Sequence, residues 1–110
     1  MEDKLRETFT QALLDSIAET QKQSGREIQA MTDETVPLLD LVGFDSHNGI
    51  EVEVLLSIRL GIEVENIPFR VGKRGSKELK VREIISALLN KYGKKFSVRL
   101  GEKTVELVVH

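Results

Sequence analysis

Residues 40–51 read Asp40-Leu41-Val42-Gly43-Phe44-Asp45-Ser46-His47-Asn48-Gly49-Ile50-Glu51, and they contain the strongest local signal in the chain. Asp and Ser are among the residue types that most often cap the first turn of a helix, so Asp45-Ser46 predicts a helix start. Gly61 follows the next apolar run and is expected to end that helix. The sequence therefore predicts a helix over about residues 46–60.

Residues 50–54 leave a second interpretation open. Ile50, Val54 and Ile58 keep the spacing of a helix, yet residues 50–54 also alternate as a half-buried strand does. The β-branched residues favour a strand, whereas acids early in the segment favour a helix. We favour the helix, and a strand here would instead indicate an α+β protein.

The most regular apolar stripe lies near the N-terminus. Leu5, Phe9, Leu13 and Ile17 recur every four residues, which predicts an amphipathic helix over about residues 3–23. Gly25 is expected to stop this helix. Residues 26–45 then read as a long connection that precedes Ser46.

A third apolar stripe predicts a helix in the C-terminal half. Its members are Val81, Ile84, Ile85, Leu88 and Leu89. Gly93 is placed to cap the end of this helix. Residues 96–100 and 104–109 look like two strands around a short turn, so residues 94–110 are predicted to form a β-hairpin-like extension.

The composition limits the number of domains and the kinds of chemistry that we expect of this chain. Its 110 residues suit one domain, with 40% hydrophobic and 31% charged residues as in a soluble globular protein. The chain has no cysteine, which excludes disulfides, a thiol nucleophile and a Cys-ligated zinc site. The charged start lacks the apolar stretch of a signal peptide, and no apolar run is long enough to span a membrane, so we expect a cytoplasmic protein.

The segment around Ser46 resembles the modification site of acyl carrier proteins, in which an apolar-Gly-x-Asp-Ser segment opens the second helix. The resemblance extends to Ile62-Glu63-Val64, where the family typically has Ile-Glu-Ile, and to residues 80–89, which are similar to the last helix. It covers about residues 3–92. The implied fold is mainly α, a three- to four-helix bundle of carrier type over residues 1–93, with the β-hairpin or strand extension of residues 94–110 appended.

The resemblance also implies a function. Ser46 would carry a covalent 4'-phosphopantetheine arm, attached by a phosphopantetheinyl transferase, with Asp45 beside it. The arm would hold acyl groups as thioesters and present them to acyl-loading and acyl-transferring enzymes, so the chain itself would not be an enzyme. The candidates for partner recognition are Asp45, His47, Asn48, Glu51 and Glu53.

The chain departs from the family pattern next to Ser46. His47 stands where a leucine is usual, Asn48 replaces an acid, and Gly49 weakens the first helical turn by about 1 kcal/mol relative to alanine. These departures indicate a specialised lipid or secondary-metabolite pathway. The rival interpretation is an unmodified carrier-like interaction module that binds a protein through the basic loop or the C-terminal strands.

Residues 70–80 form a basic loop that is inserted before the last helix of the resemblance. The candidate basic patch consists of Arg70, Lys73, Arg74 and Lys77. The loop lacks the spacing of a phosphate-binding loop, and without further aromatic residues we do not expect nucleic acid to bind. The acids Glu51, Glu53, Glu63 and Glu65 are interpreted as a solvated face, so no metal site is expected.

Overall fold

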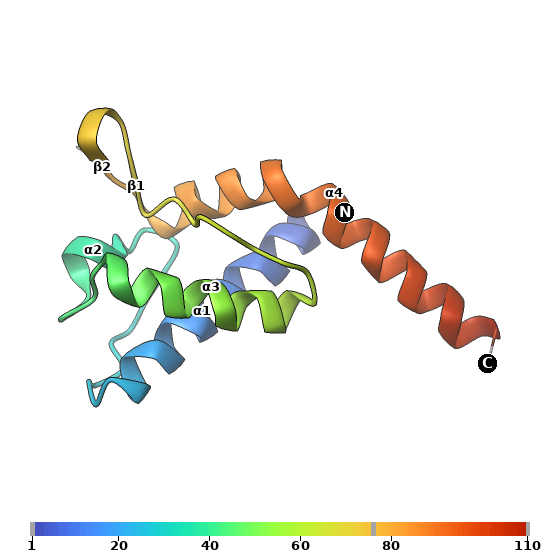
Figure 1. The fold of residues 1–110 in the computed structure, drawn as a ribbon, viewed down its shortest axis with the longest axis horizontal. Coiled ribbons are helices and arrows are strands. Elements are labelled where there is room, and N and C mark those ends of the chain that lie inside the picture. The colour runs from blue at the N-terminus through green and yellow to red at the C-terminus, as the bar shows by residue number, and fades with distance from the viewer. Residues whose placement is uncertain (1, 76, 110) are drawn as a thin grey trace.

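The computed structural model describes residues 2–75 and 77–109 and is mainly α-helical (Figure 1). In chain order its helices are α1 (Glu2–Gln23), α2 (Pro37–Asp40), α3 (Ser46–Leu60) and α4 (Val81–Val109). Two short strands, β1 (Arg70–Val71) and β2 (Lys77–Glu78), pair antiparallel around a 3-10 turn at Lys73–Gly75. The predicted α class is confirmed, and residues 50–54 belong to a helix.

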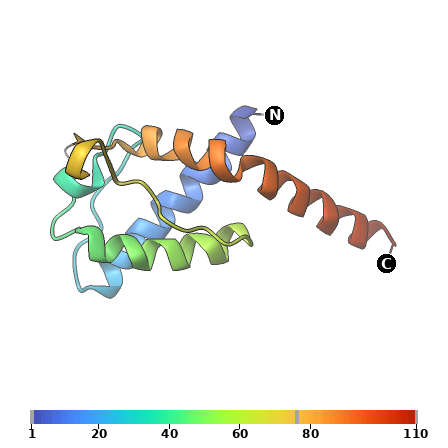
Figure 2. The ribbon, with the colours of Figure 1, turned by 45° about the horizontal axis from the view of Figure 1, so that its top comes forward.

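The core forms where α1 packs against both α3 and α4. In Figure 2, α1 runs obliquely to α3. The first half of α4 lies above α3 in this view and crosses α1. The apolar stripes predicted for α1 and α4 are buried here, whereas α3 buries Val52, Leu56 and Leu60 and leaves the regularly spaced Ile50, Val54 and Ile58 exposed. The most deeply buried members are Phe9, Leu13 and Ile17 of α1, Val52 and Leu56 of α3, and Val81, Ile84 and Ile85 of α4.

Glycines end α1 and α3 where the sequence predicts. Gly25 and Gly61 both adopt left-handed backbone conformations, with φ of 75° and 69°. The amide of Arg26 donates to the Gln21 carbonyl at 2.9 Å, and that of Gly61 donates to the Ser57 carbonyl at 2.9 Å. Each bond satisfies one carbonyl in the last turn of its helix, and glycine enters this conformation without a Cβ penalty.

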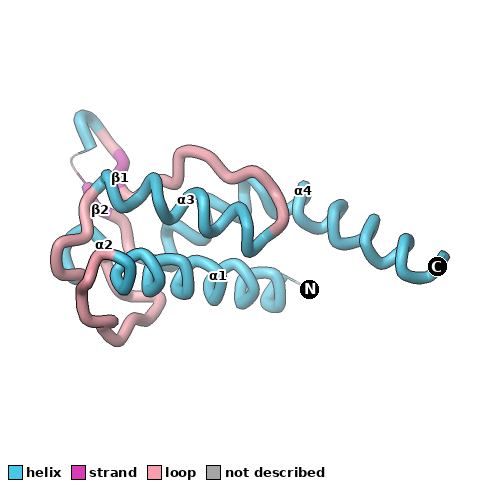
Figure 3. Tube along the Cα trace, turned by 60° about the horizontal axis from the view of Figure 1, so that its bottom comes forward, coloured by secondary structure: helices cyan, strands magenta, loops and turns pink. Residues whose placement is uncertain are grey.

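The predicted β-hairpin at residues 94–110 is wrong. Residues 94–109 continue α4, and the two-stranded sheet lies at residues 70–78, in the segment expected to be a loop (Figure 3). Gly93 keeps helical backbone and is buried instead of capping a helix end. Tyr92 and Phe96 extend the buried stripe by two further steps of four, and Phe96 packs edge-to-face on Phe9 with ring centroids 5.3 Å apart. The expected domain boundary after residue 93 therefore falls inside one helix.

Beyond Phe96, α4 projects away from the other helices (Figures 1 and 3). Val98 and Leu100 expose more than half of their surface. The radius of gyration is 14.7 Å, larger than the roughly 13 Å typical of a compact chain of this length. The projecting part of α4 accounts for this excess.

Candidate functional site at the start of helix α3

Ser46 is the first residue of α3, and Asp45 is its N-cap. The Asp45 carboxylate accepts hydrogen bonds from the backbone amides of His47 at 3.0 Å and Asn48 at 3.1 Å. The Asn48 side chain accepts in return from the Asp45 amide at 3.2 Å, which completes a capping box. Ser46 itself is exposed, and its hydroxyl makes no hydrogen bond with the described residues. The geometry presents a free hydroxyl at a firmly held helix start.

A network of polar side chains behind the cap connects the cap to the end of α1. Arg26 donates to the Asn48 side-chain oxygen at 3.3 Å and to that of Gln21 at 2.9 Å. The buried Gln21 amide donates to the Val42 carbonyl at 2.9 Å. Gly43 lies over the Arg26 guanidinium, where a Cβ would come within 2.6 Å of Nε. This hydrogen-bond network holds in place the loop that leads into Ser46.

Gly49 allows a phenylalanine ring to pack under the first turn of α3. A Cβ on Gly49 would lie 3.1 Å from the Phe69 ring, which is closer than a relaxed contact. Phe69 is buried and also packs on Phe44, with ring centroids 5.4 Å apart. The glycine that weakens the helix in isolation thus allows this close approach of the Phe69 ring.

A hollow of about 190 Å³ opens beside Ser46. Apolar side chains from α2, from α3 and from the segment after α3 line most of it, and Arg70 stands at its border. The lining residues are Leu38, Ser46, Gly49, Ile50, Glu53, Ile67, Phe69 and Arg70. The site therefore combines an exposed hydroxyl with a small, mostly apolar recess.

The other predicted site residues occupy different environments. His47 and Glu51 are exposed on the first turns of α3, as is Asp45. Glu53 is half-buried, and its carboxylate accepts from the Ile67 amide at 3.1 Å. Asn48 is only 6% exposed and faces Arg26, so its side chain is not on a surface that a partner reaches.

Three features of the site were not predicted from the sequence. Arg26 and Phe69 reach it from distant segments, and nothing in their local sequence marks them. An exposed apolar stripe of Ile50, Val54 and Ile58 also runs along α3, with 58–72% of each side chain exposed. The four-residue spacing of this stripe is visible in the sequence, but spacing alone does not tell which helix face meets solvent.

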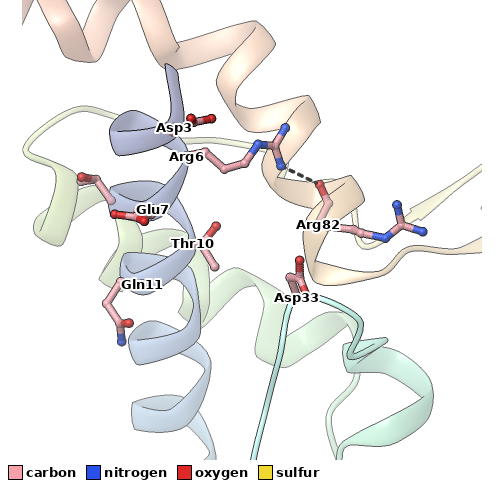
Figure 4. A pocket seen from close by; sticks show the side chains of 8 residues that line it. Asp3, Arg6, Glu7, Thr10, Gln11, Asp33 and Arg82 are labelled. Carbon is pink, nitrogen blue, oxygen red and sulfur yellow. Dashed lines mark hydrogen bonds between the residues drawn. The ribbon is translucent and has the colours of Figure 1, made fainter. Parts of the chain in front are cut away.

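A larger, open polar hollow of about 910 Å³ lies between the N-terminal half of α1 and the start of α4 (Figure 4). Arg6 crosses toward α4 and donates to the Ser86 hydroxyl at 2.9 Å. The Arg82 guanidinium points away from the α1 side chains in Figure 4 and pairs with Glu34 at 2.9 Å. No predicted site residue lines this hollow.

Two carboxylates near this hollow have perturbed pKa values. The hydrogen bond from Lys80, aided by the Arg82 charge, lowers the pKa of the Glu34 carboxyl. The hydrogen bond from the Lys80 backbone amide, aided by the Lys77 charge, lowers the pKa of Glu83. Both carboxylates stabilise the start of α4 in their charged form.

Among the side chains that the structure describes, no three of His, Asp or Glu gather as a cluster suited to a metal ion. No helix in the same part of the chain has the length and apolar character needed to cross a membrane. Comparisons of the chain with protein-family models, with curated proteins and with solved structures find no match in any of the three.

Proposed function

We propose that the chain is a carrier protein that holds acyl groups as thioesters on a 4'-phosphopantetheine arm attached to Ser46. The observation that carries the proposal is the exposed Ser46 hydroxyl, which has no hydrogen bond to the described residues, at the capped start of α3 beside an apolar recess. Because a separate transferase performs the attachment, the chain needs no catalytic base of its own. Its role is delivery and not catalysis.

The surroundings of Ser46 suit the arm chemically. A phosphodiester on Ser46 would lie at the positive end of α3, where an anion is favoured. Arg70 at the border of the hollow adds a positive charge. The arm would also supply the thiol that this cysteine-free chain lacks.

The hollow suits the first part of an acyl chain. Leu38, Ile50 and Phe69 offer it apolar surface next to the attachment point. Each methylene buried there contributes about 0.8 kcal/mol, so a recess of this size would hold a short chain or the start of a longer one. A tethered thioester also reaches any docked enzyme at high effective concentration.

The exposed stripe of Ile50, Val54 and Ile58 supports a docking role for α3. Apolar side chains in one line on an exposed helix face are typical of partner binding. With Glu51 and His47 beside them, they would contact acyl-loading and acyl-transferring enzymes of a specialised lipid or secondary-metabolite pathway. The same stripe supports the second candidate, an unmodified interaction module in which Ser46 carries no arm.

The deciding experiment is intact mass spectrometry after incubation with coenzyme A and a broad-specificity phosphopantetheinyl transferase. We expect a gain of one arm that disappears in Ser46→Ala and persists in Ser97→Ala, which removes another exposed hydroxyl. A folded sample that gains nothing with several transferases would contradict the carrier proposal and favour the interaction module.

A further inference from the structure

The hairpin formed by β1 and β2 carries four basic residues and one acid, Glu78, which is the register partner of Arg70. This basic patch consists of Arg70, Lys73, Arg74 and Lys77, all exposed. Lys77 lies 3.6 Å from the Glu83 carboxylate and is still 65% exposed. The side chains of Arg70, Lys73 and Arg74 form no ion pair or hydrogen bond with the part of the chain that the structure describes. Intramolecular contacts therefore do not account for these three cations.

Arg74 also has an unfavourable backbone conformation. Its φ of 58° and ψ of 29° place it in the left-handed region, where glycine is favoured and a Cβ is disfavoured. No described residue forms a hydrogen bond or an ion pair with the Arg74 side chain in compensation. Strained residues that a fold does not need are concentrated at binding sites. The hairpin tip thus presents an arginine where backbone geometry would favour glycine.

One member of the basic patch, Arg70, lies at the hollow of Ser46. Arg70 and Ser46 line the same hollow, and Figure 1 places the hairpin at the end of the molecule where α2 and the start of α3 lie. From the structure we propose that the basic patch is a docking surface for an acidic protein surface. This inference rests on the proposed function only in naming the partner as a protein that acts at Ser46.

The residues around the basic patch favour a protein over a nucleic acid as its partner. The aromatic residues of the chain number four Phe and one Tyr, and Phe9, Phe44, Phe69 and Tyr92 are buried. The fifth, Phe96, packs on Phe9, so no Phe or Tyr ring is free to stack on bases. The exposed Glu51 on α3 and the net charge of −2 would repel an extended phosphate backbone. A protein surface, by contrast, can match the basic patch and avoid the acids.

The first test titrates the full-length, isotope-labelled protein with a short oligoglutamate peptide and follows backbone amide shifts by NMR. We expect shifts concentrated at residues 70–78. The triple variant Arg70→Gln, Lys73→Gln, Arg74→Gln should bind the peptide about tenfold more weakly at low salt, because each exposed pair contributes about twofold to threefold.

A matched variant separates the basic patch from total charge. Lys22→Gln, Lys94→Gln, Lys95→Gln removes three exposed cations elsewhere and should leave the affinity within about twofold. An equal loss in this control, or shifts that map away from the hairpin, would overturn the proposal. Tighter binding of a single-stranded oligonucleotide or of phosphatidylserine vesicles than of the peptide would do the same.

Two single variants complete the design. Arg74→Gly should raise the thermal midpoint and weaken peptide binding about twofold, a combination that a purely structural arginine would not give. A lowered midpoint would contradict the assignment of Arg74 to binding. Ser46→Ala should bind the peptide as the wild type does, so failure of arm attachment and failure of docking are distinguished.

Discussion

Gly49 shows how one missing Cβ shapes the candidate site. Considered locally, it costs the first turn of α3 about 1 kcal/mol relative to alanine. In the fold, the Phe69 ring occupies the space that a side chain would need. Phe69 in turn forms one wall of the hollow beside Ser46. The glycine therefore lowers the helix propensity of α3, but it allows the packing of Phe69 that forms one wall of the recess.

Substituting two helical glycines by alanine should give opposite results. Gly49→Ala should lower the free energy of unfolding by about 1–2 kcal/mol, because overpacking against Phe69 outweighs the gain in helix propensity. Gly93→Ala should raise it by about 0.5–1 kcal/mol, since its nearest neighbour would be Leu5 at an ordinary 3.5 Å. Urea unfolding of both variants measures these changes. Stabilisation by both substitutions would show that the Phe69 ring can shift to make room for the added methyl group at little cost.

At the scale of elements, local signals predicted the parts of the fold that are locally determined. The limits of α1 and α3 follow from apolar stripes and from glycines with positive φ. The cap of Asp45 on α3 is equally local, which is why the exposed Ser46 could be predicted from the sequence. These features involve residues only a few positions apart.

Features that depend on distant contacts could not be predicted in this way. Residues 96–100 alternate as a strand does, but they continue α4, and Phe96 packs on Phe9 there. Arg26 and Phe69 likewise reach the site of Ser46 from other segments of the chain. The contacts of Arg26, Phe69 and Phe96 join segments far apart in the sequence, so local patterns do not reveal them.

Phe96 should therefore be the residue that fixes the middle of α4. Phe96→Ala should lower the free energy of unfolding by about 1–3 kcal/mol, because it removes a half-buried ring and its edge-to-face contact. Val98→Ala, two residues later and 55% exposed, should change it by less than about 0.5 kcal/mol. Thermal and urea unfolding provide the comparison. Equal losses in both variants would contradict the assigned contact.

The start of α4 should make stability depend on acid pH. Hydrogen bonds from Lys80 lower the pKa of both Glu34 and Glu83 in the folded state. A carboxyl whose pKa is lower when folded stabilises the protein above its unfolded pKa, and this contribution is lost as pH falls through the folded value. Stability should therefore decline as pH drops below about 4.5, the ordinary pKa of a glutamate.

The double variant Glu34→Gln, Glu83→Gln tests this pH dependence. At neutral pH it should be less stable than the wild type, and the difference should shrink on acidification below about pH 4.5. Urea unfolding across a pH series measures the difference directly. If the free energy of unfolding falls with pH equally in the variant and in the wild type, other carboxylates cause the acid sensitivity.

At the scale of the whole molecule, the chain divides into a packed body and a projecting helix end. The body contains the core of α1, α3 and the first half of α4, and it also contains Ser46 and its hollow. The extent of 47 Å along the longest axis includes the end of α4. Because Figures 1 and 2 show this end apart from the other elements, the body should not depend on it.

A chain that stops at Leu100 tests this division. Its free energy of unfolding should match that of the full chain within about 0.5 kcal/mol, since the deleted turns lie away from the body. Its radius of gyration in solution scattering should fall from near 14.7 Å toward about 13 Å, the value typical of a compact chain. A loss of more than about 1 kcal/mol, with an unchanged radius, would mean that the end of α4 folds back onto the body in solution. Ser46 and its hollow belong to the body, so arm attachment in the truncated chain should equal that in the full chain.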